Sequence, residues 1–311
     1  NPVTPTFQAR RAADGVVAGA RHVCEDFPTS SPASAQPTLP SARAALLRRL
    51  GAAVALSLMG AAMAQTAPAP AAPTPACDKP VYLSFRTGSM EVAPLVAVVL
   101  QRHKVRATFF ASADPTPQGG DALDSTWAPW WKARGDEGHA FASQTRDEVL
   151  WLGDVRGKPP GFLVRPQLGA FAGRTFTWSA AKYCENIDVT ADRLAHITGV
   201  NEMAAFRAPG DSVSPALVAA AKACGFRHVP TVPVAFLAEG ANAPRSPTDK
   251  QVAQTVARVR PGDVLLAHLG VWSREVPQVP VGLEPLITGL QAQGFCFRTL
   301  REHPVYGSAG S

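Results

Sequence analysis

The sequence has 311 residues, of which 46% are hydrophobic, and its formal net charge is +6. This length and composition can bury the core of one large domain or of two modest ones. The basic residues form no tract and are not interleaved with aromatic residues, so we expect no nucleic-acid partner.

The first 76 residues have the composition of a leader rather than of a folded domain. Residues 1–40 are rich in Pro, Ser and Ala, and we interpret them as a disordered or misassigned N-terminal extension. Residues 41–64 combine arginines, a short apolar run and a closing Ala62-Met63-Ala64, which is the pattern of a secretory signal peptide. The apolar run is too short to span a membrane. Residues 65–76 form a Pro/Ala-rich linker, so we expect a secreted or periplasmic protein with no membrane span in the mature chain.

Strand-like runs alternate with helical patterns in the rest of the chain. The first run, Val81 to Phe85, is short, β-branched and aromatic, as is typical of a buried parallel strand. Six similar runs follow at 106–110, 139–143, 204–206, 227–229, 264–268 and 295–299. This alternation predicts an α/β fold and favours a single (β/α) barrel over two domains.

Apolar spacing predicts helices between these strands. The expected helices cover 92–104, 127–134, 179–198, 215–224, 249–259 and 283–293. We also expect residues 144–148 to enter a helix that contains Val149, Leu150 and Leu152. Residues 153–177 show little periodicity and are interpreted as an excursion on the surface.

Four cysteines follow the signal peptide: Cys77, Cys184, Cys224 and Cys296. An even number of cysteines in an oxidising compartment favours two disulfides over a metal site. The sequence allows three pairings. We favour Cys77 with Cys296, because the first and last strands of a barrel are neighbours, which leaves Cys184 with Cys224.

Five motifs at the ends of the expected strands resemble those of a known family. They are Leu83-Ser84-Phe85-Arg86-Thr87-Gly88, Arg106-Ala107-Thr108-Phe109-Phe110, Gly138-His139-Ala140-Phe141-Ala142-Ser143-Gln144-Thr145, Phe206-Arg207-Ala208-Pro209-Gly210 and Asp263-Val264-Leu265-Leu266-Ala267-His268. In these motifs residues 77–305 resemble the polysaccharide deacetylase family, the NodB-homology domain of carbohydrate esterase family 4, and 306–311 form a tail. The resemblance implies a distorted (β/α)7 barrel of the NodB-homology type.

The resemblance also implies a reaction and a cofactor. The family removes acetyl groups from sugars with a divalent metal such as Zn²⁺, which is held by one Asp and two His. An Asp acts as general base and a His as general acid, and the metal lowers the pKa of its bound water.

Most of the matching positions carry other residues in this sequence. Arg86 stands where the family has its base, and Thr87 where it has the metal-binding Asp. Gln144 and Glu148 stand where it has the two His ligands. A guanidinium cannot accept a proton, and an amide is a poor zinc ligand. We therefore expect no bound metal and an impaired enzyme, a pseudoenzyme.

Two family positions are retained. His268 occupies the position of the general acid, and Arg207 that of the residue that orients the base. We hypothesise that Arg86 pairs with Glu148 and that Asp211 pairs with Arg207, because a buried unpaired arginine is costly. A satisfied core imidazole is the alternative interpretation of His268.

Several residues are candidates for sugar binding. They are Trp127, Trp130, Trp131 and Trp272, whose rings could stack on sugars, together with Pro209 in the fourth motif. Core packing at helical spacing is the alternative for the first three tryptophans.

The expected function is binding of a cell-envelope or extracellular glycan, with little or no catalysis. One alternative is an active deacetylase whose metal is displaced and held by Glu148, His268 and Asp211. The other is a protein-binding scaffold, which would have no sugar affinity.

Overall fold

The fold is described from a computed structural model, which covers residues 77–157, 160–230, 249–270 and 279–307. The predicted extension, signal peptide and linker lie outside these ranges. Among the described residues, no helix is long and apolar enough to cross a membrane.

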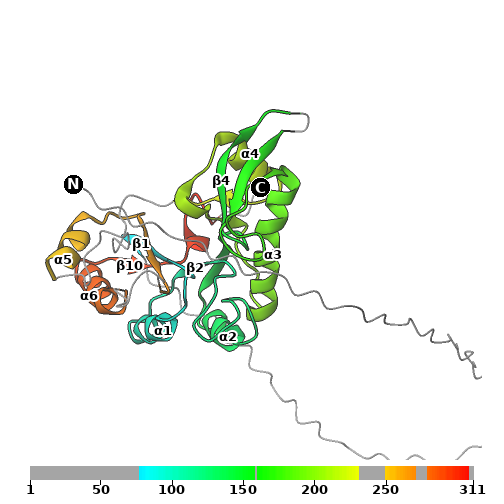
Figure 1. Cartoon of the computed structure of the whole chain (residues 1–311). Helices are drawn as coiled ribbons and strands as arrows, with labels where there is room; N and C mark the ends of the chain where they lie inside the picture. Colours follow the sequence, from blue (N-terminus) through cyan, green and yellow to red (C-terminus); the bar gives the residue numbers. More distant parts are fainter. Residues whose placement is uncertain (1–76, 158–159, 231–248, 271–278, 308–311) are drawn as a thin grey trace, which may run out of the picture. The chain divides into compact units, whose positions relative to one another are not determined.

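A seven-stranded parallel sheet forms the centre of the fold (Figure 1). Its strands are β1 (Pro80–Arg86), β2 (Thr108–Ala111), β3 (Ala140–Ser143), β7 (Ala205–Phe206), β8 (Arg227–His228), β9 (Val264–His268) and β10 (Cys296–Phe297). The order is β10-β1-β2-β3-β7-β8, and β9 also pairs with β1. These strands are the seven that the sequence predicts. Within the described ranges no ladder joins β8 to β9, so closure of the barrel stays a prediction.

Helices follow the strands and cover the sheet (Figure 1). They are α1 (Ala93–Arg102), α2 (Ala128–Asp136), α3 (Ala180–Thr198), α4 (Pro215–Ala223), α5 (Asp249–Arg258) and α6 (Val279–Ala292), with short 3₁₀ turns η1 (Pro209–Asp211) and η2 (Leu300–Glu302). All six α-helices lie where apolar spacing predicts them. Local capping explains two of their starts, because Ser179 and Ser214 accept hydrogen bonds from Lys182 N and Leu217 N.

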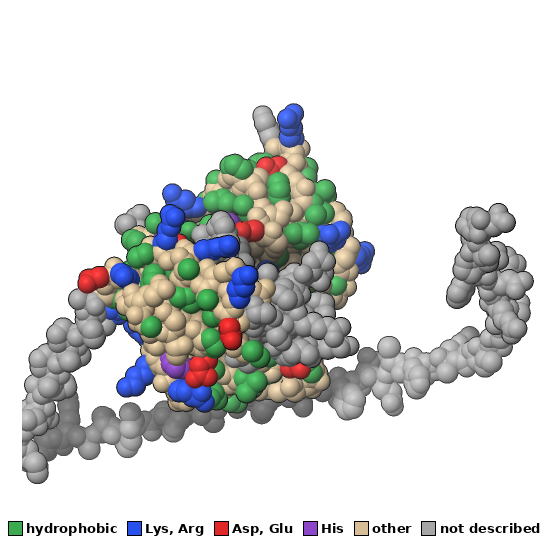
Figure 2. Space-filling view, turned by 90° about the vertical axis from the view of Figure 1, so that its left-hand side faces the viewer, with side chains coloured by type: hydrophobic (Ala, Val, Ile, Leu, Met, Phe, Trp, Pro, Cys, Tyr) green, Lys and Arg blue, Asp and Glu red, His purple; other side chains and the backbone are tan. Residues whose placement is uncertain are grey.

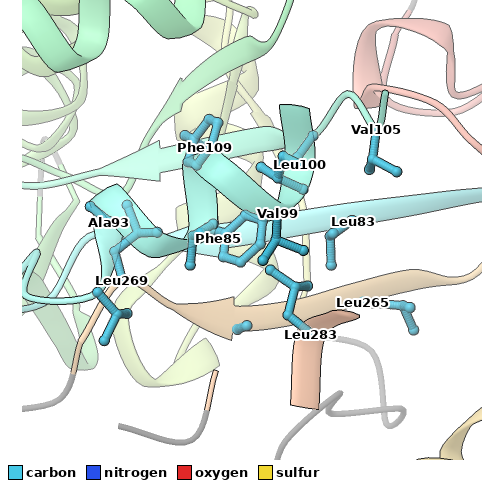
Figure 3. Packing of buried hydrophobic residues seen from close by; sticks show 14 of the residues in the cluster. Leu83, Phe85, Ala93, Val99, Leu100, Val105, Phe109, Leu265, Leu269 and Leu283 are labelled. Carbon is cyan, nitrogen blue, oxygen red and sulfur yellow. The ribbon is translucent and has the colours of Figure 1, made fainter. Parts of the chain in front are cut away.

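The outward face of the sheet packs against the helices. Phe85 and Phe109 lie against Leu100 of α1 and Leu283 of α6 in one apolar cluster (Figure 3). The inward face holds a smaller cluster that includes Phe110 of β2. Neighbouring residues of a strand point to opposite faces, so Phe109 and Phe110 belong to different cores.

A separate antiparallel sheet corrects the prediction for residues 149–179. It consists of β4 (Val149–Val155), β5 (Gly161–Pro166) and β6 (Phe176–Ser179), in the order β4-β5-β6. The expected helix after Gln144 is wrong, because Val149 begins a strand. The short apolar run at 149–152 is compatible with the period of a helix and with that of a strand. In the structure this segment is a strand, because its backbone pairs with β5. Phe162 and Val164 alternate with exposed Leu163 and pack in one cluster with residues of α3.

Both favoured disulfides are present. Cys77 pairs with Cys296 beside the β1–β10 ladder, with Cα atoms 6.0 Å apart. Cys184 of α3 pairs with Cys224 at the end of α4, with Cα atoms 6.4 Å apart.

Candidate functional site

The carboxyl ends of the parallel strands bring the residues of the sequence motifs together. Arg86 ends β1, and its Cα is paired with Phe110 of β2 on one side and with His268 of β9 on the other. Gln144 follows β3, and its backbone N–H bonds to Ala111 O of β2. Parallel strands end at the same edge of a sheet, which explains why residues distant in sequence meet here.

Arg86, Gln144 and Glu148 form one hydrogen-bonded network. Arg86 Nε donates to Gln144 Oε1 at 2.6 Å, and Arg86 Nη2 lies 3.1 Å from Glu148 Oε1. Gln144 Nε2 donates to the same Glu148 oxygen. The hypothesis of an Arg86–Glu148 ion pair is therefore confirmed, and Gln144 joins both partners.

The environment of Glu148 shifts the pKa of its carboxyl. Burial raises the pKa of this carboxyl, and the nearby charge of Asp114 raises it further, whereas Arg86 and His268 lower it. The opposing cations do not reverse the effect of burial. Glu148 thus binds its proton more tightly than an exposed glutamate does.

A strained turn holds Glu148 in place. Thr145 and Glu148 both have left-handed backbone conformations, with φ of 65° and 46°. Thr145 Oγ1 accepts a hydrogen bond from Val149 N at 2.8 Å, and Asn186 of α3 binds Asp147 through its side-chain amide. Non-glycine residues keep such conformations only where surrounding contacts impose them, and these are often functional positions.

Thr87 does not join the Arg86 network but a second, buried cluster. Its hydroxyl lies 3.0 Å from Ser112 Oγ and donates to Asp114 Oδ2. Ser112 Oγ donates to the same carboxylate oxygen at 2.6 Å. Ser112 and Asp114 are not among the site residues predicted from the sequence. A signal for them existed, because both are polar residues directly after the second predicted strand.

Arg207 is fully buried, and the groups that it contacts directly are neutral. Its Nη1 donates to Ser84 Oγ at 3.2 Å, its Nε to Val229 O at 3.4 Å, and its Cζ lies 4.0 Å from the centre of the Phe110 ring. Nη2 has no hydrogen-bond partner among the described residues. Burial lowers the pKa of Arg207 to about 9, and the charge of Arg86 contributes, so Arg207 is still a cation at neutral pH.

Asp211 contacts a different residue from the one that the sequence suggested. Its carboxylate lies 3.8 Å from His228 Nε2, and the described residues include no ion pair between Asp211 and Arg207. The expected Arg207–Asp211 pair is not formed at ion-pair distance, although the charge of Asp211 raises the pKa of Arg207. Gly210 and Asp211 both have positive φ in the turn η1, which lies between Arg207 and α4. Pro209, a predicted substrate-binding residue, is buried in the same turn.

His268 lies half-buried at the end of β9. It is close enough for its charge to lower the pKa of Glu148. This places the imidazole at the same edge as Arg86, in agreement with its predicted position. Its role as an acid stays a prediction.

The tryptophan cluster lies on the opposite face of the sheet from this site. Trp127 and Trp131 are 7% and 0% exposed, and Trp131 packs edge-on against Phe109 and Phe141. These two rings offer no face to a sugar, so the core-packing alternative describes them. Trp130 is half-buried, and the Arg134 guanidinium lies 5.1 Å from its ring. Trp272 lies outside the described residues.

The residues at the family's metal-ligand positions do not fit a zinc ion. Thr87 supplies a hydroxyl already bound to Asp114, and Gln144 supplies an amide. Glu148 supplies one carboxylate, which faces the Arg86 guanidinium. Among the residues that the structure describes, no three His, Cys, Asp or Glu side chains gather as metal ligands do.

Comparison with known proteins agrees with the geometry of the fold. Residues 74–229 match the family described as polysaccharide deacetylase. Curated proteins contain no match to the chain.

Solved structures share the fold at low sequence identity. PdaA of Bacillus subtilis, a family 4 carbohydrate esterase, is 21% identical, with a TM-score of 0.52 over 72% of this chain and 80% of PdaA. A family 4 acetyl xylan esterase of Clostridium thermocellum, in complex with a cobalt ion, is 21% identical, with a TM-score of 0.51 over 72% and 89% of the two chains. A mutant of BA3943 of Bacillus anthracis, a CE4 family pseudoenzyme, is 16% identical, with a TM-score of 0.51 over 72% and 67%. At these identities the three structures show that this chain shares their fold.

Proposed function

Because the chain belongs to the polysaccharide deacetylase family, we propose that it acts on glycans by binding them and that it lacks the family's metal-dependent hydrolysis. One observation carries this proposal. The Arg86 guanidinium is hydrogen-bonded to both Gln144 and Glu148, the residues at the positions of the two histidine ligands. The cationic Arg86 side chain thus binds the two side chains that would face a metal cation in the family's arrangement.

The chemistry of the substituted residues supports the same conclusion. Hydrolysis of an acetyl group needs a base that takes a proton from water, and Arg86 cannot accept one. Glu148 could accept a proton, but its carboxylate is bound to Arg86 and Gln144. His268 and Arg207 are retained without the base that Arg207 would orient.

The proposed partner is a cell-envelope or extracellular polysaccharide. The signal-peptide pattern at 41–64 and the two disulfides support a secreted or periplasmic location, because disulfides persist in oxidising compartments. The face in Figure 2 supports the expectation that nucleic acid is not a partner. On this face the Lys and Arg side chains are spread among acidic and hydrophobic ones instead of forming one basic patch.

Three measurements on the purified secreted chain test the proposal. We expect binding to some members of a glycan array, no stoichiometric zinc by elemental analysis, and no acetate release from acetylated chitooligosaccharides or xylan. Bound zinc together with acetate release would establish the alternative of an active deacetylase with a displaced metal. Absence of any glycan binding would favour the protein-binding scaffold.

A further inference from the structure

The side chains of Arg86 and Arg207 interact electrostatically on the inward face of the main sheet. Arg207 Nη1 donates to Ser84 Oγ, and Ser84 precedes Arg86 by two residues on β1. Residues i and i+2 of a strand share a face, so Ser84 and Arg86 point to the same side of β1. The Arg207 guanidinium, which is bound to Ser84, therefore lies on the same side as Arg86 and nearer the start of the strand. The Phe110 ring under Arg207 belongs to the residue whose Cα is paired with Arg86, which agrees with this placement.

Each of the two guanidinium groups has an unused donor. The contacts of Arg86 with described residues involve Nε and Nη2, and none involves Nη1. Arg207 is 0% exposed, and its Nη2 has no hydrogen-bond partner among the described residues. A buried charged donor without a protein acceptor is rare in folded proteins, and a bound ligand or ion is one way in which such a donor is satisfied.

The charges around the pair favour an anion between the two arginines. The charge of Arg86 contributes to the lowered pKa of Arg207, so the two cations repel each other. Glu148 pairs with Arg86. The charge of Asp211 raises the pKa of Arg207, but no described carboxylate lies within ion-pair distance of the Arg207 guanidinium. Asp114 is bound to Thr87 and Ser112, and Asp211 faces His228.

We propose that the space between the Arg86 and Arg207 guanidinium groups binds a carboxylate. Its two oxygens can accept from Arg86 Nη1 and Arg207 Nη2 at once, as planar carboxylates do with arginine. Because Arg207 is fully buried, the group must be small and terminal, which fits a carboxylate better than a phosphodiester within a polymer. A uronic acid at a glycan end and a free small carboxylate both supply this chemistry. The uronic-acid case rests on the proposed glycan-binding function.

Pairs of ligands that are similar in shape and differ in charge test this site in the unmodified protein. Acetate and its neutral isostere acetamide are compared by thermal shift and calorimetry, and glucuronate is compared with glucose in the same way. We expect acetate or glucuronate to raise the Tm in a concentration-dependent manner, and their neutral partners to leave it unchanged. Equal effects of the charged and neutral partners would overturn the proposal. Binding of acetate alone identifies a free carboxylate as the ligand, and binding of glucuronate alone identifies an acidic sugar.

Substitutions then locate the site. Arg86→Gln should weaken carboxylate binding about tenfold or more, since it removes a charged donor. Arg258→Gln makes the same change at an exposed position of α5 and should leave the affinity within about twofold. Arg86→Lys keeps the positive charge but loses the planar guanidinium with its several donors, and should bind the carboxylate with intermediate affinity. Identical affinities of the Arg86 and Arg258 variants would refute this location.

The glycan array separates failure of this inference from failure of the proposed function. If neutral glycans bind and carboxylates do not, the carboxylate site is wrong and glycan binding stands. If carboxylates bind and no glycan does, the site stands and the glycan-binding function is wrong.

Discussion

The two faces of strand β2 have different surroundings. Phe109 points outward and packs with Phe85, Trp131 and Phe141 in a continuous apolar core. Phe110, the next residue, points inward and lies under the Arg207 guanidinium. The outward face contains what an α/β fold needs for its stability. The inward face holds a smaller apolar cluster, and it and the strand ends also carry charged side chains such as Arg207 and Arg86.

This difference explains how a family fold can persist while its site changes. The substituted positions Arg86, Thr87, Gln144 and Glu148 all lie at strand ends, and none belongs to the outward core. Two of the residues at these positions, Arg86 and Glu148, have opposite charges and form an ion pair. The following predictions test this separation of stability from chemistry.

The largest effect is expected when the family residues are restored at the strand ends. The combined variant Arg86→Asp, Thr87→Asp, Gln144→His and Glu148→His should bind zinc about 1,000-fold more tightly than the unmodified chain, at roughly tenfold for each of three gained ligands. Calorimetry with zinc measures the gain. The matched control keeps Thr87 and carries the other three changes, and it should bind more weakly. Equal zinc affinity of the restored and unmodified chains would show that these positions do not converge.

Truncation on the outward face should affect stability. Trp131→Ala removes a ring that is 0% exposed and should lower the free energy of unfolding by about 3–5 kcal/mol, because a cavity remains in the core. Leu95→Ala on α1, where the side chain is 55% exposed, is the control and should cost less than about 1 kcal/mol. Urea unfolding followed by circular dichroism measures both. A small effect at Trp131 would contradict its place in the core.

Acid should destabilise the fold through His139, which lies far from the site at the start of β3. Burial lowers the pKa of His139 to about 4, and the charge of Arg134 adds to this, while Glu137 opposes it. The unfolded state takes up the proton near the usual pKa of 6.5, so neutral His139 stabilises the fold above that pH. This stability, up to about 3 kcal/mol, is lost as the pH falls from 6.5 to 4.

A comparison with His139→Asn isolates this contribution. Asn retains an acceptor for Ala107 N and does not titrate, so the variant should lose less stability between pH 6.5 and 4. The comparison is needed because the raised pKa of Glu148 acts in the opposite direction, stabilising the fold as the pH falls. Parallel pH profiles of the two proteins would contradict the assignment to His139.

The smallest effect is expected from Glu148. Glu148→Ala leaves the mostly buried Arg86 without its carboxylate and should lower the free energy of unfolding by about 1–3 kcal/mol. Glu185→Ala breaks the exposed pair with Lys182 on α3 and should cost at most about 1 kcal/mol. An unchanged melting temperature of Glu148→Ala, relative to the Glu185 control, would count against the ion pair.

Much of the fold and part of the site follow from local signals. The seven strands of the main sheet and the six helices were predictable, because buried strands and amphipathic helices have distinct periods. Both disulfides were predictable from the even number of cysteines and from the expected neighbourhood of the first and last strands. The Arg86–Glu148 pair was predictable because opposite charges had replaced residues that the family brings together. The sheet at 149–179 was missed, since a short apolar run fits a helix as well as a strand.

The sequence by itself determined which residues stand at the strand ends, and its resemblance to the family predicts that they replace the base and the metal ligands. The tertiary structure decided what these residues contact. Asp114 meets Thr87, Arg207 lies below Arg86, Asp211 faces His228, and Trp131 is enclosed in the core. The physical reason is that periodicity assigns a side chain to a face of a strand, whereas sheet register and backbone bends such as η1 set the distance between side chains from different strands.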